Sequence, residues 1–361
     1  MSSSTPVSAE PERPANLLGL DRNGIAGAHP RLARPAYRAA SLYRWIYHRR
    51  EADFRRMSDL PAPLRHELAL RLRIGWPLVD AVAVSRDGTH KYLLALDDGL
   101  RVEAVYIPQP SGRITLCLSS QVGCALGCRF CRTARMGFVR NLTPGEIIGQ
   151  ALRLEERHGL RPPYNVVLMG MGEPLLNLDA VLVAFRILCD PEGMGLSARR
   201  ISVSTAGYVP GIRRLATERL RPRLAVSLNA TTDAARSDLM PVNRRYPLAE
   251  LLQACREFAA GSRERVTFEY VVLQGLNDGA AELRRLARLL APLRCKVNLI
   301  PFNPIGDQDF HQPQARDLER MRRALVALGV PASVRWSKGA DIGAACGQLW
   351  WEHKQAPEGS T

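Results

Sequence analysis

The sequence predicts an α/β protein, a partial (β/α) barrel with a small N-terminal α+β accessory domain. The main observation is that, from about residue 113, short β-rich runs alternate with helical stretches, as in a parallel sheet wrapped by helices. The clearest helix is 143–159, where Thr143 is placed to cap, Pro144 takes the first helical position and Glu146 completes a capping box. The active site of such a barrel lies at the carboxyl ends of its strands. The candidate strands are 114–120, 165–170, 199–205, 223–229, 266–273, 296–302 and 333–337.

The first 110 residues predict a different organisation. The N-terminal stretch is rich in Ser, Pro, Ala and Arg with little periodicity, which is typical of a basic flexible tail. Apolar residues at helical spacing then predict helices over 41–50 and 61–75. Two apolar runs around Asp97-Asp98-Gly99 predict a β-hairpin over 91–108. The expected division is a tail at 1–34, an accessory domain at 35–110, the barrel at 111–349 and a C-terminal tail at 350–361.

Composition indicates a globular protein with a polyanionic partner. The chain has 361 residues and 46% hydrophobic content, which is enough for one large core with a smaller appendage. Its 50 Lys and Arg against 35 Asp and Glu give a net charge of +15. This charge favours nucleic acid as the partner, and an anionic membrane surface is the second choice. The alternative without a partner is that the charge only keeps the protein soluble. No apolar stretch is long enough to span a bilayer and residues 1–35 lack the apolar core of a signal peptide, so we expect a soluble cytoplasmic protein.

The eight cysteines are expected to be reduced thiols that act as ligands or catalysts. Cys124, Cys128 and Cys131 form a C-x3-C-x2-C loop directly after a candidate strand, and three thiolates this close should share one soft metal centre. Structural zinc usually takes a fourth protein ligand, and no Cys or His lies nearby at such spacing. A four-iron cluster instead leaves one iron open to a substrate. The loop therefore favours a [4Fe-4S] cluster over structural zinc or a chance loop.

Three further features accompany this loop. The segment GMGEP at 170–174 follows a candidate strand, its glycines allow close backbone approach, and Glu173 supplies an acceptor for an ammonium group. A tight strand-to-helix turn is the simpler interpretation of this segment taken alone. Cys117 lies shortly before the loop, and Cys346 lies in the glycine- and alanine-rich stretch 339–349. From composition alone, each of these two thiols would be a buried, inert side chain.

Together these motifs resemble those of the RlmN/Cfr family of radical-SAM RNA adenosine methyltransferases, over residues from about 40 to 349. The segments GMGEPLLN and VEAVYIP resemble the RlmN branch, whereas residues 306–321 depart from its pattern. The matching segments are WIYHRR, VEAVYIP, CLSSQVGCALGCRFCRTARMGF, RNLTPGEIIGQ, NVVLMGMGEPLLN, ISVSTAGYVP, AVSLNA, LMPVNRRYPL, FEYVVLQGLND, KVNLIPFNP and GADIGAACGQL.

The resemblance implies a radical-SAM barrel and assigns a role to each site residue. It implies that S-adenosylmethionine (SAM) is used twice per turnover, once to methylate a cysteine and once to make a radical. It makes Cys346 the cysteine that carries the methyl group and Cys117 the partner that resolves it, with Glu103 as a proton acceptor. The implied ligands of the [4Fe-4S] cluster are Cys124, Cys128 and Cys131, and the residues implied to surround SAM are Gly172, Glu173, Ser204, Ser227, Leu228, Asn229 and Asn303.

The same resemblance implies an RNA substrate, namely 23S rRNA and tRNA, methylated at C2 of adenosine. An external electron donor and a thiol reductant would complete the cycle. We expect a monomer without membrane association, whose accessory domain contacts RNA. Methylation at C8, as in the Cfr branch, is the nearest alternative. One rival from a different class is a non-catalytic iron-sulfur or zinc RNA-binding module, and an enzymatic rival is a radical-SAM enzyme of another type acting on protein or small molecules. Neither requires both Cys117 and Cys346.

Overall fold

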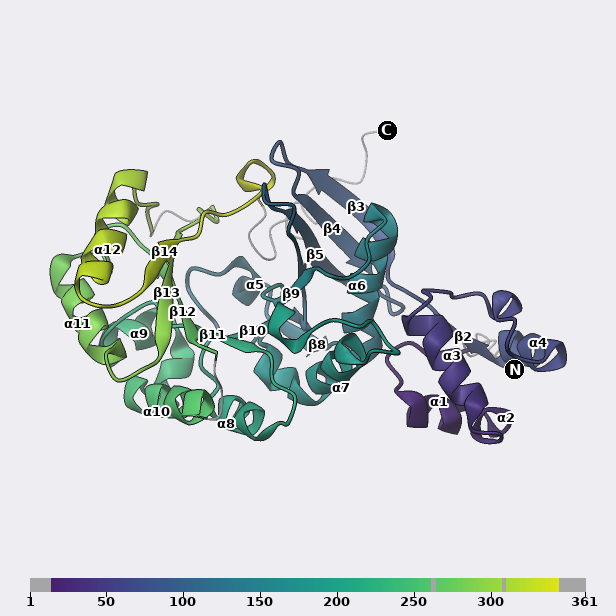
Figure 1. The fold of residues 1–361 in the computed structure, drawn as a ribbon. Coiled ribbons are helices and arrows are strands. Elements are labelled where there is room, and N and C mark those ends of the chain that lie inside the picture. Colours follow the sequence, from purple (N-terminus) through teal and green to yellow (C-terminus); the bar gives the residue numbers. More distant parts are fainter. Residues whose placement is uncertain (1–13, 261–263, 307–309, 344–361) are drawn as a thin grey trace, which may run out of the picture.

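The protein folds into a helical N-terminal unit that adjoins an open α/β barrel (Figure 1). The computed structural model describes residues 14–260, 264–306 and 310–343. No helix in these ranges is both long and apolar enough to cross a lipid bilayer. Cys346 and the expected C-terminal tail at 350–361 lie outside the described residues.

The barrel is formed by the parallel part of a ten-stranded sheet. Its strands follow one another in chain order from β6 to β14, and every neighbouring pair is parallel. Strands of this kind are rich in apolar residues because both faces of the sheet are covered. Each strand expected from the sequence is found, which confirms the α/β prediction. The parallel strands are β6 (Ile114–Leu118), β9 (Asn165–Leu168), β10 (Ile201–Thr205), β11 (Arg223–Ser227), β12 (Val266–Val272), β13 (Cys295–Pro301) and β14 (Ala332–Val334).

Helices between these strands lie on the outside of the barrel (Figure 1). The predicted capping box is confirmed at the start of α6, where the Thr143 hydroxyl accepts the Glu146 N–H and the Glu146 carboxylate accepts the Thr143 N–H. Gly159 ends the same helix in the left-handed region, with φ of 61°. The outer helices are α6 (Pro144–His158), α7 (Leu178–Cys189), α8 (Val209–Thr217), α10 (Leu248–Ala260), α11 (Ala280–Leu290) and α12 (Ala315–Ala327).

Three antiparallel strands extend the barrel sheet beyond β6. These are β3 (Leu78–Val84), β4 (His90–Ala95) and β5 (Arg101–Pro108), and they confirm the hairpin predicted over 91–108. They do not belong to a separate domain, however, because β5 pairs with β6. The short connection between β5 and β6 places the two strands side by side. Their pairing provides hydrogen-bond partners for the backbone groups along the edge of β5. The expected accessory domain at 35–110 is therefore divided, with its β part inside the main sheet.

The helical N-terminal unit begins earlier than expected. Residues 14–34 are not part of a mobile tail, because Leu17, Ile25 and Leu32 are fully buried in the core. The Tyr47 hydroxyl accepts the Gly19 N–H at 2.8 Å and fixes this segment on the following helix. A few large apolar residues suffice because Leu17, Leu18, Ile25 and Leu32 are all buried, which composition alone does not reveal. The elements are β1 (Ala15–Asn16), α1 (Arg22–Ala28), α2 (Pro30–Ala33), α3 (Tyr37–Tyr47), η1 (Phe54–Arg56), α4 (Ala62–Arg71) and β2 (Leu72–Arg73).

Candidate functional site

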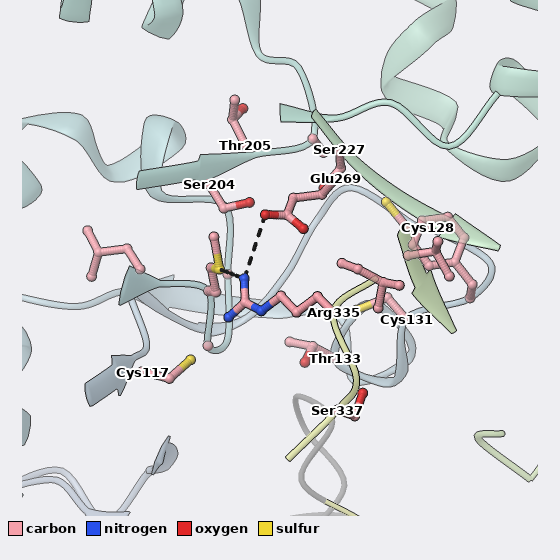
Figure 2. A pocket seen from close by; sticks show the side chains of 18 of the residues that line it. Cys117, Cys128, Cys131, Thr133, Ser204, Thr205, Ser227, Glu269, Arg335 and Ser337 are labelled. Carbon is pink, nitrogen blue, oxygen red and sulfur yellow. Dashed lines mark hydrogen bonds and ion pairs between the residues drawn. The ribbon is translucent and has the colours of Figure 1, made fainter. Parts of the chain in front are cut away.

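A cavity of about 650 Å³ lies at the carboxyl ends of the parallel strands. Residues from each strand between β6 and β14, or from the loop that follows it, line this cavity. Figure 2 shows side chains from these separate segments pointing toward a common space. The geometry matches the rule that a barrel of parallel strands builds its site from loops at one end.

The loop with the three clustered cysteines is held in place by a small hairpin. Strand β7 (Gln121–Gly123) precedes the loop, α5 (Arg132–Arg135) follows it, and β8 (Phe138–Asn141) pairs with β7. The Cys124 N–H donates to the Gly137 carbonyl at 2.9 Å, which closes the loop at its base. Gly123 has φ of 73°, and a Cβ there would lie 1.8 Å from the Gly137 oxygen, so only glycine fits.

The structure brings Cys124, Cys128 and Cys131 to one wall of the cavity. In the described residues, no three His, Cys, Asp or Glu side chains converge closely enough to hold a single metal ion. Burial raises the pKa of the Cys124 thiol to about 12 and raises that of Cys128 as well. Iron binds the thiolate form of cysteine, and the positive charge of the iron would offset the cost of ionising these buried thiols. Three separate thiols on one wall fit a multi-iron cluster, in which different iron atoms take different ligands.

The GMGEP turn lies directly behind the loop. Gly172 has φ of 100°, and a Cβ there would lie 2.5 Å from the Gln121 side chain. The buried Glu173 carboxylate accepts the N–H groups of Leu175 at 3.1 Å and Ala206 at 2.7 Å. Burial nevertheless raises the pKa of Glu173 to about 7. An ammonium group bound in the cavity would favour the charged form of the Glu173 carboxylate. The site is therefore suited to the amino group of SAM that the sequence resemblance implies.

The other residues implied to surround SAM divide into two groups. Ser204 and Ser227 line the cavity, whereas Leu228 and Asn229 are fully buried behind its wall. Asn229 holds the wall together, because its side-chain oxygen accepts the Val271 N–H at 2.8 Å. Asn303 reaches the cavity indirectly, since its amide donates to the Ser337 hydroxyl at 2.7 Å and Ser337 is a lining residue.

The structure places Cys117 and Glu103 differently with respect to the cavity. Cys117 lines the cavity and is buried beside Val105 and Val167. Burial raises its pKa to about 11, and the nearby positive charge of Arg335 acts in the opposite direction. Glu103 is not among the lining residues, and its carboxylate lies 3.3 Å from the buried Lys91 ammonium. Thus the cavity includes the expected resolving cysteine but not the expected proton acceptor.

Three charged lining residues, Glu269, Arg335 and Lys338, were not expected from the sequence. Glu269 on β12 is buried, and its Oε1 lies 3.6 Å from Nη1 of Arg335, which follows β14. Arg335 also contacts the Met169 sulfur at 3.6 Å, and Figure 2 shows its guanidinium between Glu269 and the Cys117 side of the cavity. Among the described residues, Glu269 Oε2 has no hydrogen-bond partner. The sequence does contain a signal for Glu269, because it is a charged residue within the apolar strand sequence VTFEYVV. Burying a charge in a strand costs free energy, so such a residue usually has a specific role.

Comparisons with known proteins agree with this geometry. The Radical SAM superfamily matches residues 118–290, and the ribosomal RNA large subunit methyltransferase N-terminal domain matches residues 15–74. The dual-specificity RNA methyltransferase RlmN of Syntrophotalea carbinolica is 48% identical over 318 residues, covering 88% of this chain and 85% of that protein. The RlmN of Rhodospirillum rubrum is 48% identical over 345 residues, covering 93% and 80%.

A solved structure gives the same result for the fold. A radical SAM methyltransferase from Sphaerobacter thermophilus is 45% identical to this chain and superposes with a TM-score of 0.86. The match covers 93% of this chain and 99% of that one, so it includes both the N-terminal unit and the barrel. The chain therefore belongs to the RlmN family of radical SAM methyltransferases.

Proposed function

We propose that the protein methylates C2 of adenosine in 23S rRNA and in tRNA, through a methyl group carried on Cys346 and released by Cys117. The observation that carries this proposal is the presence of Cys117 in the same cavity as the three clustered cysteines. The relatives named dual-specificity RNA methyltransferases support an RNA substrate. The net charge of +15 supports contact with a polyanion.

We expect this cavity to hold both cofactors. Cys124, Cys128 and Cys131 would hold a [4Fe-4S] cluster, and Gly172 and Glu173 would receive the methionine end of SAM. Ser204 and Ser227 line the adjoining wall, with Leu228, Asn229 and Asn303 supporting it. When bound, the cluster and SAM supply the radical chemistry needed for an electron-poor ring carbon, with two SAM molecules used per turnover.

The protein's own thiols carry the methyl group and release the product. The Cys346 thiolate accepts a methyl group from one SAM by displacement. Radical chemistry supplied by the cluster and a second SAM would remove one hydrogen atom from this methyl group, and the carbon would then bond to the base with loss of the ring proton and of one electron, which the oxidised cluster would accept. The Cys117 thiolate attacks the Cys346 sulfur. The sulfur–carbon bond breaks, the released carbon takes up a proton, and methylated RNA leaves while a Cys117–Cys346 disulfide remains. An external thiol then reduces this disulfide, and an external electron donor supplies the electron for radical formation.

The geometry favours Cys117 over Glu103 as the acceptor of the ring proton. Cys117 lines the cavity, whereas Glu103 is paired with Lys91 and does not. Even so, a thiol pKa of about 11 requires a nearby positive charge for ionisation, and Arg335 is the cation with the larger effect in this sense, with Lys91 acting in the same direction. The proposed assignment is therefore Cys117 as the base, with Arg335 assisting.

Further expectations concern the setting of the reaction. We place the protein in the cytoplasm, as a monomer, where both RNA substrates occur. The N-terminal unit is the proposed additional RNA contact, since it matches a domain of the same kind in RNA methyltransferases. C8 methylation by the same machinery remains the second candidate, because the departure of 306–321 from the RlmN pattern concerns substrate choice.

The test is mass spectrometry of the anaerobically purified protein, with Cys117→Ala beside the wild type. A methyl group on the peptide that contains Cys346, or an RNA adduct on it in the variant, is the expected result. Nuclease digestion of the product and identification of the modified nucleoside then distinguish C2 from C8. Unmodified Cys346 in protein with an intact cluster and added SAM would contradict the two-cysteine mechanism.

A further inference from the structure

The chain just before Cys346 is attached to the hairpin between β3 and β4, about 250 residues away in sequence. The Ser85 hydroxyl donates to Oδ1 of Asp341 at 2.6 Å, and the Arg86 N–H donates to Oδ2 at 3.1 Å. The Gly339 N–H donates to Oδ2 of Asp87 at 3.1 Å. Figure 1 shows this segment, in yellow after β14, beside the tip of the β3–β4 hairpin. The contacts are reciprocal, with each segment supplying one carboxylate to the other.

A buried lysine makes the last contact before the described residues end. Lys91 on β4 is fully buried, and its ammonium donates to the carbonyl of Gly343. The same ammonium lies 3.3 Å from the buried Glu103 carboxylate. A buried ammonium requires paired and hydrogen-bonded neighbours, and removing one of them is costly. The Gly343 carbonyl is thus held by a side chain that has little freedom to move.

The strand register places this contact in line with Cys117. Lys91 is opposite Val105, and Val105 is opposite Cys117, so the three side chains form a row on one face of the sheet. Directly opposed residues in antiparallel strands point to the same face. Neighbouring strands are about 4.8 Å apart, so Lys91 lies about 10 Å from Cys117 across the row.

The length of chain after Gly343 is of the same order as the Lys91–Cys117 separation. Cys346 follows Gly343 by three residues, and three Cα–Cα steps span at most about 11 Å. Fixing Gly343 on Lys91 therefore sets the point from which this short reach is measured. Without it, the nearest attachment in the described residues is Asp341, two residues further back, which enlarges the accessible region.

We infer that Lys91 and Asp341 are positioning residues, which hold the start of the Cys346 segment within reach of Cys117 and the cavity. Lys91 acts through the Gly343 carbonyl, and Glu103 keeps the Lys91 ammonium in place. Holding the Lys91 ammonium is a role for Glu103 that agrees with its ion pair to Lys91 and with its absence from the cavity wall. Pre-positioning of two reacting groups lowers the entropic part of a barrier, and small displacements reduce rates strongly. The inference rests on the proposed function, because it assumes that Cys346 and Cys117 react with each other.

The test compares Lys91→Met and Asp341→Asn with the wild type, using the full-length protein carrying its cluster. Arg86→Ala is the matched control, since it removes a positive charge from the same hairpin but keeps the backbone N–H that reaches Asp341. Four quantities are measured: iron content, reductive cleavage of SAM to 5′-deoxyadenosine, the methylated fraction of Cys346, and the yield of methylated RNA per 5′-deoxyadenosine formed. We expect both variants to lose at least tenfold in the last quantity, with iron content unchanged and Arg86→Ala like the wild type.

The outcomes separate the inference from the proposed function. Normal methylation and coupling in both variants would overturn the positioning role while leaving the two-cysteine mechanism intact. A parallel loss of iron content and SAM cleavage would also overturn it, because that result indicates general damage to the fold. Asp341→Asn keeps the test decisive if Lys91→Met fails to fold, since Asp341 is exposed. A wild type without methyl on Cys346 would overturn the proposed function itself, and the positioning role with it.

Discussion

Replacing Arg236 by methionine is expected to destabilise the barrel strongly. Arg236 on α9 (Asp233–Leu239) is fully buried, and burial lowers the pKa of its guanidinium to about 10, so that it stays charged at neutral pH. It donates to the carbonyls of Leu228 at 3.0 Å, Ser227 at 2.9 Å and Ala206 at 2.6 Å, and to the Asn243 side chain at 3.0 Å. One side chain thus ties together the loops that follow β10 and β11.

The magnitude follows from these four bonds. A hydrogen bond from a charged donor contributes roughly 1.5–3 kcal/mol, but bonds from one side chain are not independent. Methionine retains the apolar contacts of the arginine stem, so the net loss is expected to be about 3–5 kcal/mol. At about 2 °C per kcal/mol for a large domain, the thermal midpoint should fall by about 6–10 °C.

The assay is thermal unfolding followed by circular dichroism, with Arg213→Met as the control. Arg213 is 46% exposed and pairs with Glu250 at 3.3 Å and Glu257 at 3.1 Å. Each exposed pair contributes about 0–1 kcal/mol, so losing both pairs should shift the midpoint by at most about 4 °C. If Arg236→Met shifted the midpoint no more than Arg213→Met, the assigned role of the buried guanidinium would be refuted.

Four further predictions concern the cavity. With a pKa of about 11, Cys117 should react with iodoacetamide about tenfold faster per pH unit between pH 7 and 10, because the thiolate is the reactive form; a rate that levels off below pH 9 would contradict this pKa. Glu173→Gln should weaken SAM binding by about tenfold or more with the cluster retained, which equilibrium binding would show. In the cofactor-free protein, the pKa of Glu173 is raised to about 7, so the folded state holds this carboxyl protonated more readily than the unfolded state does. The wild type should therefore lose stability relative to Glu173→Gln as the pH rises from about 5 to 8. Thermal midpoints of the two proteins that change in parallel over that range would refute this prediction. Gly172→Ala should reduce SAM binding at least as much as Glu173→Gln, since its φ of 100° and a Cβ 2.5 Å from Gln121 force the turn to move; unchanged affinity would show that the turn can adapt.

Local patterns predicted the parts of the fold that depend on near neighbours. The capping box from Thr143 to Glu146 and the hairpin over 91–108 are each encoded within a few residues, and both are confirmed. The burial of Leu17 and Ile25 was missed, because their partners lie in other segments and the surrounding composition is that of a tail. The membership of β5 in the main sheet was missed for a similar reason, since pairing with β6 is a choice among possible neighbours.

The candidate site shows the same division. The spacing of Cys124, Cys128 and Cys131 predicted neighbouring thiols, because three cysteines on one short loop must lie close together whatever the rest of the chain does, and the structure places all three on the cavity wall. Glu269 and Arg335 escaped notice, since each is an ordinary charged residue until strands β12 and β14 bring them to one cavity. Likewise Glu103 was expected at the reaction centre, and only the fold reveals its pairing with Lys91.

By itself the sequence determined the class of the protein: an α/β barrel with a three-cysteine loop, a glycine-rich turn, two additional cysteines and a basic surface. These properties are carried by short-range spacing and composition, which do not depend on how distant segments meet. Only the tertiary structure decided which side chains share the cavity, and that Lys91 meets the Gly343 carbonyl. The physical reason is that such contacts join residues hundreds of positions apart, and they form only when packing of the whole chain has selected one arrangement of its strands.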